Sequence, residues 1–211
     1  MRDDINQLTS IVKQYIQPPK NFLEIGSYDG ADTVTIANYW DLLPQQCYIV
    51  EANPIAYNKI KVNMPDCNSY NFAASDKNEP IILRRALHSS DKVSGMSSVL
   101  HCRIQHNVEN ISVDGRRIDE FLNEINEKID LIKIDVEGFA YQVLVGFGDM
   151  ISTIDAIQIE TEKLECWYDQ KLHSDIDQYL TSKNFRLVDI KEDSRNIQYD
   201  CLYINNARQL L

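Results

Sequence analysis

The spacing of hydrophobic residues changes along the chain, and each spacing predicts a different element. Residues 3–16 are apolar at nearly helical intervals before Pro18-Pro19, which predicts a helix within residues 1–20. Short apolar runs then alternate with helical patterns. The runs predict strands at residues 21–26, 47–52, 69–74, 129–135 and 156–161, and the helical patterns lie at 33–40, 118–125, 141–147 and 172–180. Asn53-Pro54 also predicts a helix start. This alternation favours a parallel sheet covered by helices.

Two regions depart from this alternation. Residues 77–110 are the least regular, with one plausible strand at 80–84, and we expect them to cover the acceptor side of a binding site. Residues 185–190 and 200–205 predict an antiparallel hairpin at the C-terminal end. We find neither an internal repeat nor a linker, so we expect residues 1–211 to form a single domain.

Composition and charge narrow the class of protein. The 211 residues are 44% hydrophobic and 25% charged, which is typical of a soluble globular protein. Lys and Arg number 21 against 32 Asp and Glu, a net charge of −11, so neither nucleic acid nor an anionic membrane surface is an expected partner.

The five cysteines form no Cys-x-x-Cys pair, so we expect no metal site and a reducing compartment. With neither a signal peptide nor a membrane span in the sequence, we expect a cytoplasmic protein.

Carboxylates stand at the ends of most of the predicted parallel strands. In an open sheet of this kind, ligands bind in the crevice at the carboxyl ends of the strands. Glu24, Glu51, Asp135 and Glu160 lie on or just past four of these strands, and Glu137 follows closely after Asp135. The sequence therefore places its candidate chemistry along one edge of the sheet.

The turn after the first strand argues against a dinucleotide. Gly26 and Ala31 fit the dinucleotide fingerprint, but the middle glycine, which lets pyrophosphate approach, is replaced by Tyr28. Asp29 would repel phosphate as well. Glu51 follows about 20 residues after the turn, where an acid accepts hydrogen bonds from a ribose diol. A phosphate-free, cationic ligand with a ribose describes S-adenosylmethionine.

Five segments together resemble the FkbM family of S-adenosylmethionine-dependent methyltransferases. They are residues 24–30 (EIGSYDG), 50–54 (VEANP), 73–76 (AASD), 97–99 (SSV) and 132–138 (IKIDVEG), of which the last is the most specific. The resemblance covers about residues 20–165. It implies a single-domain, Rossmann-like α/β class I methyltransferase fold. In that fold a seven-stranded, mostly parallel sheet has the order 3-2-1-4-5-7-6, helices on both faces and an antiparallel seventh strand.

The resemblance implies S-adenosylmethionine as the cofactor and S-adenosylhomocysteine as its product. Glu24 would hold the amino group of the methionine part and Glu51 the ribose, while Asp135 would face both the methionine end and the acceptor. Neighbouring residues would complete the cofactor site: Gly26, Ser27, Tyr28, Asp29 and Gly30 around the methionine, Ala52 and Asn53 along the adenosine, and Ala74 and Ser75 at the adenine.

The catalytic candidates are Asp135, Glu137 and Glu160. Methyl transfer requires an aligned acceptor oxygen and the removal of its proton. Glu137 is placed to take that proton once burial raises its pKa, although an acid there also suits the start of a helix. Ser97 and Ser98 would hydrogen-bond the acceptor or hold a turn. Histidines of the irregular segment are alternative bases or acceptor contacts, namely His88, His101 and His106.

The leading hypothesis is an O-methyltransferase for a sugar, a glycan or a similar small polar metabolite. The alternatives are a methyltransferase for a protein side chain or an amine, and a non-catalytic, cofactor-binding partner subunit. The intact acids Glu24, Glu51, Asp135 and Glu137 argue against the last of these. A homodimer is compatible with the sequence.

Overall fold

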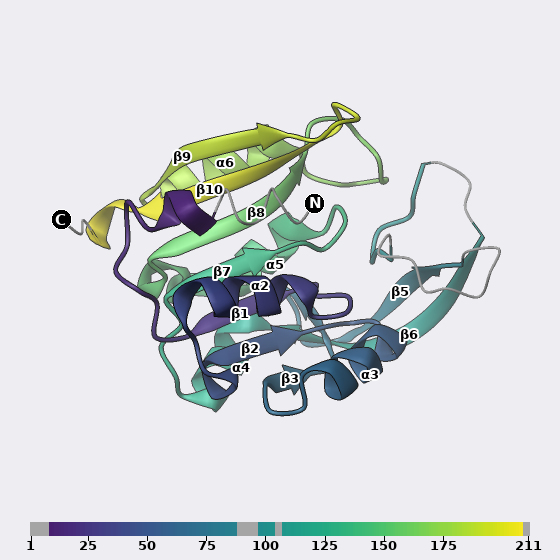
Figure 1. The fold of residues 1–211 in the computed structure, drawn as a ribbon. Coiled ribbons are helices and arrows are strands. Elements are labelled where there is room, and N and C mark those ends of the chain that lie inside the picture. The colour runs from purple at the N-terminus through teal and green to yellow at the C-terminus, as the bar shows by residue number, and fades with distance from the viewer. Residues whose placement is uncertain (1–8, 88–96, 104–106, 209–211) are drawn as a thin grey trace.

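The computed structural model describes residues 9–87, 97–103 and 107–208. Within these residues the chain forms a seven-stranded sheet in the order β3-β2-β1-β7-β8-β10-β9 (Figure 1). Neighbouring strands are parallel from β3 to β8, and β10 is antiparallel to both of its neighbours. The strands are β1 (Phe22–Ile25), β2 (Cys47–Val50), β3 (Asn68–Tyr70), β7 (Leu131–Ile134), β8 (Ala156–Glu162), β9 (Phe185–Glu192) and β10 (Gln198–Asn205). The predicted strand order and C-terminal hairpin are confirmed.

Helices cover both faces of this sheet. The helices are α2 (Ala31–Trp40), α3 (Pro54–Asn63), α4 (Ile118–Ile125), α5 (Ala140–Gly146) and α6 (His173–Ser182). The largest apolar core joins α4, α5 and α6 to one face, while α2, α3 and the helical residues 9–12 pack on the other. The predicted start of α3 is confirmed, because the Asn53 side chain accepts a hydrogen bond from the Ile55 N–H and Pro54 follows it. Residues 1–8 of the predicted N-terminal helix lie outside the described residues.

The prediction of one strand at residues 69–74 was wrong. The chain leaves the large sheet after Tyr70, and a separate strand, β4 (Ala73–Ser75), joins a second sheet with the order β4-β6-β5. In this sheet β5 (Pro80–Ala86) and β6 (Val108–Arg117) form an antiparallel hairpin that extends away from the large sheet (Figure 1). Residues 69–74 (SYNFAA) contain neither Gly nor Pro, so the sequence gives no signal that the strand ends at Tyr70.

The segment at 77–110 is therefore more regular than its sequence predicts. It contains β5 and the beginning of β6, and Ser98 forms a bridge with Arg84 on β5. Residues 88–96 and 104–106, and with them His88 and His106, lie outside the described part of the chain. In the part that is described, no helix has the length and apolar character needed to cross a bilayer.

Candidate active site

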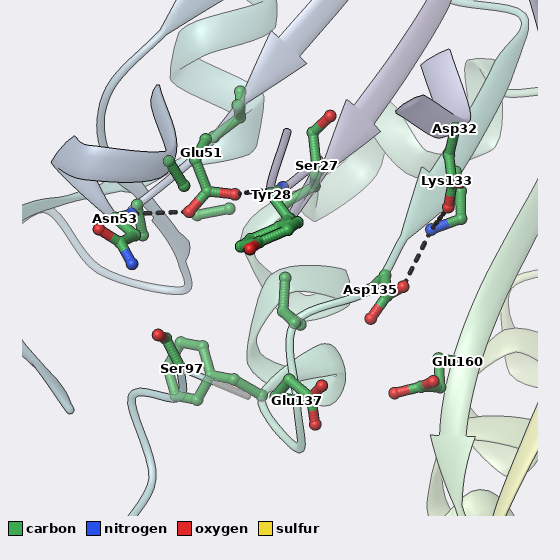
Figure 2. Close-up of a pocket in the computed structure, with 18 of the residues that line it drawn as sticks. Ser27, Tyr28, Asp32, Glu51, Asn53, Ser97, Lys133, Asp135, Glu137 and Glu160 are labelled. Atoms are coloured by element: carbon green, nitrogen blue, oxygen red, sulfur yellow. Dashed lines mark hydrogen bonds and ion pairs between the residues drawn. The ribbon is translucent and has the colours of Figure 1, made fainter. Parts of the chain in front are cut away.

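A cavity of about 1030 Å³ opens at the carboxyl ends of the parallel strands. Its wall is built from the turn after β1, the end of β2, strand β4, the residues after β7, strand β8 and the turn between β9 and β10. Figure 2 shows that side chains from these separate segments point into a common space. The edge of the sheet predicted from the sequence is thus the place where the cavity lies.

Glu51 is held at the end of β2 by two backbone groups (Figure 2). Its Oε2 accepts a hydrogen bond from the Tyr28 N–H at 2.8 Å, and its Oε1 accepts one from the Asn53 N–H at 2.7 Å. Each carboxylate oxygen can accept more than one hydrogen bond, so both oxygens keep capacity for a ligand. Burial raises the pKa of Glu51 to about 7, although the two N–H groups act in the opposite direction. A diol that donates to both oxygens would stabilise the charged carboxylate.

The turn after β1 packs closely against the end of β7. Gly26 has φ +84°, and a Cβ at this position would lie 1.8 Å from the carbonyl oxygen of Asp135. Only glycine fits such an approach, so the turn and Asp135 form one continuous wall. Tyr28 and Asp29 also line the cavity, and the Lys59 ammonium lies 4.9 Å from the centre of the Tyr28 ring. Gly30 begins α2 and contributes no surface to the cavity.

Glu24 lies in the interior rather than on the cavity surface. Its side chain is fully buried, and its Oε2 accepts hydrogen bonds from the hydroxyls of Ser27, at 2.7 Å, and Thr33. Ser27 and Lys133, both in contact with Glu24, do line the cavity. Contact between Glu24 and a cofactor amino group therefore stays a prediction. The structure shows the hydrogen bond from Ser27 to Glu24 and the ion pair of Glu24 with Lys133.

Lys133 is a site residue that the sequence reasoning missed. It lies beside Glu24 in the register of β1 and β7, and its ammonium is 3.1 Å from Asp32, 3.0 Å from Asp135 and 3.5 Å from Glu24. Burial alone would lower the pKa of Lys133, but the three carboxylates hold it well above the ordinary value. The signal in the sequence was a lysine inside an otherwise buried strand, which needs a partner of opposite charge.

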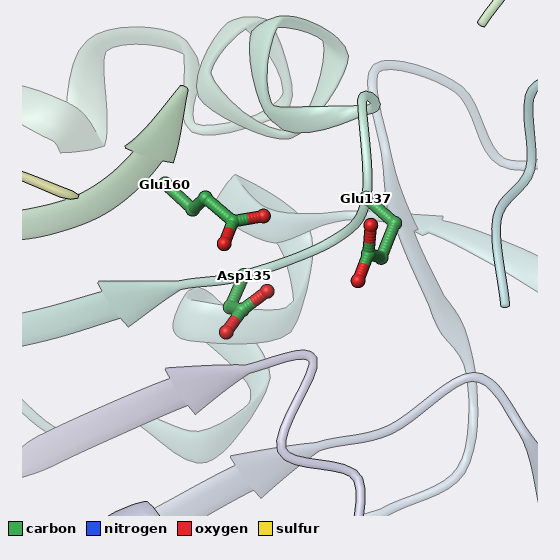
Figure 3. Close-up of side chains that lie close together, drawn as sticks. All are labelled: Asp135, Glu137 and Glu160. Carbon is green, nitrogen blue, oxygen red and sulfur yellow. The ribbon is translucent and has the colours of Figure 1, made fainter. Parts of the chain in front are cut away.

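Asp135, Glu137 and Glu160 come together on the wall of the cavity (Figure 3). One oxygen of each carboxylate lies within 4.8 Å of the others. Glu137 adopts φ 50°, a left-handed conformation, three residues ahead of α5, so it does not belong to the first turn of that helix. Glu160 lies within β8, opposite Asp200 of β10, and not at the strand end. The structure thus brings the three predicted catalytic residues together.

The electrostatics of this cluster favour proton binding. Burial, followed by the nearby carboxylates of Asp135 and Glu162, raises the pKa of Glu137 to about 8. Burial and the surrounding carboxylates also raise the pKa of Glu160 well above its usual range. Glu137 can therefore accept and release protons near neutral pH. Three carboxylates at this spacing also occur in proteins without any bound cation, so the spacing alone does not identify a metal centre.

The remaining predicted residues divide between the cavity and the structure around it. Ala52, Asn53, Ala74 and Ser97 line the cavity, whereas Ser75 is buried and does not. Ser98 is buried and its hydroxyl donates to the Glu137 carbonyl at 2.6 Å, which is the arrangement expected of a residue that holds a turn. His101 is exposed beside the Tyr168 ring and does not line the cavity.

The turn between β9 and β10 supplies cavity residues that the sequence did not indicate. Arg195 of the turn and Gln198, the first residue of β10, line the cavity together with Gln158 and Asp200 of β8 and β10. Polar residues in a hairpin turn usually face solvent, so nothing in their pattern distinguished these side chains. Their place in the site depends on how the hairpin lies across the sheet.

Comparison with known proteins agrees with this architecture. A family model described as the methyltransferase FkbM domain matches residues 24–187, most of the chain. The chain belongs to the FkbM methyltransferase family. The resemblance stated from the sequence motifs is therefore confirmed, and this FkbM protein carries the family's motifs at the cavity described above. Among curated proteins, none matches the chain.

Solved structures show the same fold. A methyltransferase FkbM from Methylobacillus flagellatus KT superposes on 90% of this chain with a TM-score of 0.60 and 14% identity, and the chain spans only 44% of that protein. Magnesium protoporphyrin IX methyltransferase from Synechocystis PCC 6803, solved with bound SAM, has a TM-score of 0.56 and 8% identity, and the match covers 97% of this chain and 79% of that protein. An O-methyltransferase from Bacillus cereus in complex with SAH has a TM-score of 0.51 and 12% identity, and the match covers 96% of this chain and 81% of that protein. The FkbM chain thus has the fold of S-adenosylmethionine-dependent methyltransferases.

Proposed function

We propose that this FkbM protein is an S-adenosylmethionine-dependent O-methyltransferase that acts on a hydroxyl of a sugar, a glycan or a similar small polar metabolite. The observation that carries the proposal is the cluster of Asp135, Glu137 and Glu160 on the wall of a cavity whose other side has groups suited to the cofactor. The proposal therefore has two parts, a cofactor half and an acceptor half.

The cofactor half fits S-adenosylmethionine by its chemistry. Glu51 has remaining acceptor capacity on both oxygens, as a ribose diol requires, and Gly26 keeps the turn open where a Cβ would collide. Asp29, Asp32 and Asp135 place negative charge along the cavity, which favours a cationic ligand over a phosphate. When bound, S-adenosylmethionine supplies an electrophilic methyl group on a positively charged sulfur.

The acceptor half supplies a base. Glu137 would take the proton from the acceptor hydroxyl as the oxygen forms its bond to the methyl carbon. With a pKa of about 8, Glu137 holds a proton for much of the time at neutral pH. A cationic ligand in the adjoining half of the cavity would lower that pKa, because opposite charge favours the ionised form. Binding would thus convert Glu137 into a carboxylate at the stage when a base is needed.

The substitution Glu137→Gln tests this role. It preserves the shape of the side chain but cannot accept a proton, so we expect turnover to fall by roughly 10²–10⁴-fold with little change in cofactor affinity. Single-turnover transfer of labelled methyl from S-adenosylmethionine to a panel of methyl glycosides measures the first quantity, and calorimetry with S-adenosylhomocysteine measures the second. Nearly full activity in this variant would rule out Glu137 as the base.

One observation favours a second candidate, a methyltransferase for an amine. The acceptor side carries Asp135, Glu137, Glu160 and Asp200, and an amine is cationic at neutral pH. The same experiment with amino glycosides separates the two candidates. An amine methyltransferase would form an N-methyl amine, whereas an O-methyltransferase would form a methyl ether, and the position of the labelled methyl group identifies the product.

A further inference from the structure

Gln198 connects the hairpin turn to the carboxylate cluster. It is the first residue of β10 and only 4% exposed, and its side-chain Nε2 donates a hydrogen bond to Oε1 of Glu160 at 2.8 Å. Its Oε1 accepts a hydrogen bond from Nη2 of Arg195 at 2.5 Å. A buried amide thus lies between a guanidinium and a carboxylate.

The order of these groups fixes the orientation of the amide. A guanidinium only donates hydrogen bonds, so Arg195 must face the amide oxygen of Gln198. The amide nitrogen is then directed at Glu160, and it occupies Oε1 as a donor. The second oxygen of Glu160, Oε2, is left as the atom at which a proton or a ligand hydroxyl is held.

The turn itself is ordered by Asp193. Its Oδ1 accepts hydrogen bonds from the N–H groups of Ile197, at 2.8 Å, and Gln198, at 3.1 Å, and its Oδ2 accepts one from Nε of Arg195 at 2.9 Å. Despite partial burial, these donors lower the pKa of Asp193 to about 2, so it stays charged throughout the neutral range. Asp193, Arg195 and Gln198 therefore form a continuous chain of hydrogen bonds ending on Glu160.

We propose that Gln198 is a positioning residue that holds Glu160 so that Oε2 receives a second hydroxyl of the acceptor, next to the hydroxyl whose proton Glu137 takes. The inference rests on the proposed function and deepens it. Oxygens of Glu137 and Glu160 lie within 4.8 Å of each other, a separation that two hydroxyls on adjacent ring carbons can bridge with one hydrogen bond to each carboxylate. The acceptor class is therefore a vicinal diol.

Glu160 faces a predominantly negative environment, which makes its orientation important. Asp135 and Glu137 act on it from the segment after β7, Glu162 from β8 and Asp200 from β10, while Arg195 lies on the hairpin turn. Without the amide of Gln198, repulsion from these carboxylates would turn Glu160 away from Glu137. The donor at Oε1 offsets this repulsion and keeps the carboxylate in place.

The first test needs no acceptor. Carboxyl-¹³C glutamate labelling, with Glu160 assigned through Glu160→Gln, follows the titration of Glu160 by NMR. In Gln198→Met the new side chain is similar in size to glutamine but has no hydrogen-bond donor. We therefore expect the midpoint of the Glu160 titration to rise by roughly 0.5–1 pH unit. Arg195→Gln, at a side chain that is 59% exposed, should produce a smaller shift in the same direction. Lys163→Met is the matched control, because Lys163 contacts Glu192 and Asn196 of the same turn without touching Glu160.

The second test compares methyl glycosides that have vicinal hydroxyls with their singly deoxygenated analogues. Wild-type protein should prefer the diols, and Gln198→Met should lose roughly 10- to 100-fold in kcat/KM for diols, mainly through KM, with little change for the deoxy compounds. Equal losses for both classes, or an unshifted Glu160 titration in both variants, would overturn the inference. If the wild-type protein methylates none of the glycosides, the proposed function fails instead, and the NMR titration still decides whether Gln198 holds Glu160.

Discussion

Glu51 and Glu137 show how neighbouring groups give one residue type two different uses. Both are glutamates past a strand end with a raised pKa, but Glu51 accepts hydrogen bonds from two backbone N–H groups, whereas Glu137 faces other carboxylates. Fixed donors make Glu51 a suitable binding group because they hold its oxygens in one position. Like-charged neighbours make Glu137 a suitable proton acceptor because they keep its proton affinity high.

Glu51→Ala should weaken binding of S-adenosylhomocysteine by about 1–3 kcal/mol, roughly 5- to 150-fold, because a ribose diol loses its acceptors. Titration calorimetry measures the change, and Glu79→Ala, an exposed position outside the cavity, serves as the control. The same instrument should detect no NAD binding, since Tyr28 and Asp29 occupy the turn where a pyrophosphate would lie. Comparable affinities for NAD and S-adenosylhomocysteine would contradict this assignment of the cavity.

At the scale of elements, β1 and β7 are joined by a buried charge network as well as by their ladder. Lys133 of β7 contacts Glu24 of β1, Asp32 of α2 and Asp135 past the end of β7. A single ammonium thus compensates three carboxylates from three segments. Removing one partner from a buried ion pair usually costs more than replacing the whole pair, because the remaining charge is left uncompensated.

Lys133→Met should therefore destabilise the fold by about 3–5 kcal/mol at neutral pH. Urea unfolding monitored by circular dichroism measures the loss. The double variant Lys133→Met with Glu24→Gln should recover part of it, because the buried carboxylate that Lys133→Met leaves uncompensated is then absent as well. A double variant no more stable than Lys133→Met alone would show that Glu24 does not depend on Lys133.

The elements also show what a single sequence can reveal. Periodicity was sufficient to predict most strands and the terminal hairpin, and the carboxylates along one edge of the sheet were sufficient to select Asp135, Glu137 and Glu160 as candidates, which the structure brings together. The break between β3 and β4 was not predictable, because neither Gly nor Pro lies between Tyr70 and Ala73 to mark the end of a strand. The bond between Gln198 and Glu160 was not predictable either, since it depends on the register of β10 against β8.

At the scale of the whole molecule, several buried acids lie in the cavity wall or close behind it. The net charge is −11, and burial raises the pKa of Glu51, Glu137 and Glu162 to about 7, 8 and 7. The folded protein therefore binds more protons than the unfolded chain between the ordinary glutamate pKa and about pH 8. Stability must fall with rising pH wherever the folded state binds more protons.

The ligand-free protein should thus be more stable near pH 5.5 than near pH 8.5. Thermal unfolding across this range checks the expectation, and Glu137→Gln should flatten part of the slope because it removes one of the titrating groups. A cationic ligand should reduce the slope by stabilising the ionised carboxylates. A wild-type melting temperature that rises steadily over this interval would contradict the burial of these acids.

The close contact between Gly26 and the Asp135 carbonyl has a consequence for how two substrates bind. Gly26 belongs to the turn that lines the proposed cofactor half, while the Asp135 side chain belongs to the proposed acceptor half. Because the two backbones are in close contact, a shift of one would displace the other, and we expect occupancy of the first half to change the affinity of the second. Reciprocity would then require the acceptor to alter cofactor affinity by the same factor, so we expect the two substrates to bind cooperatively rather than independently.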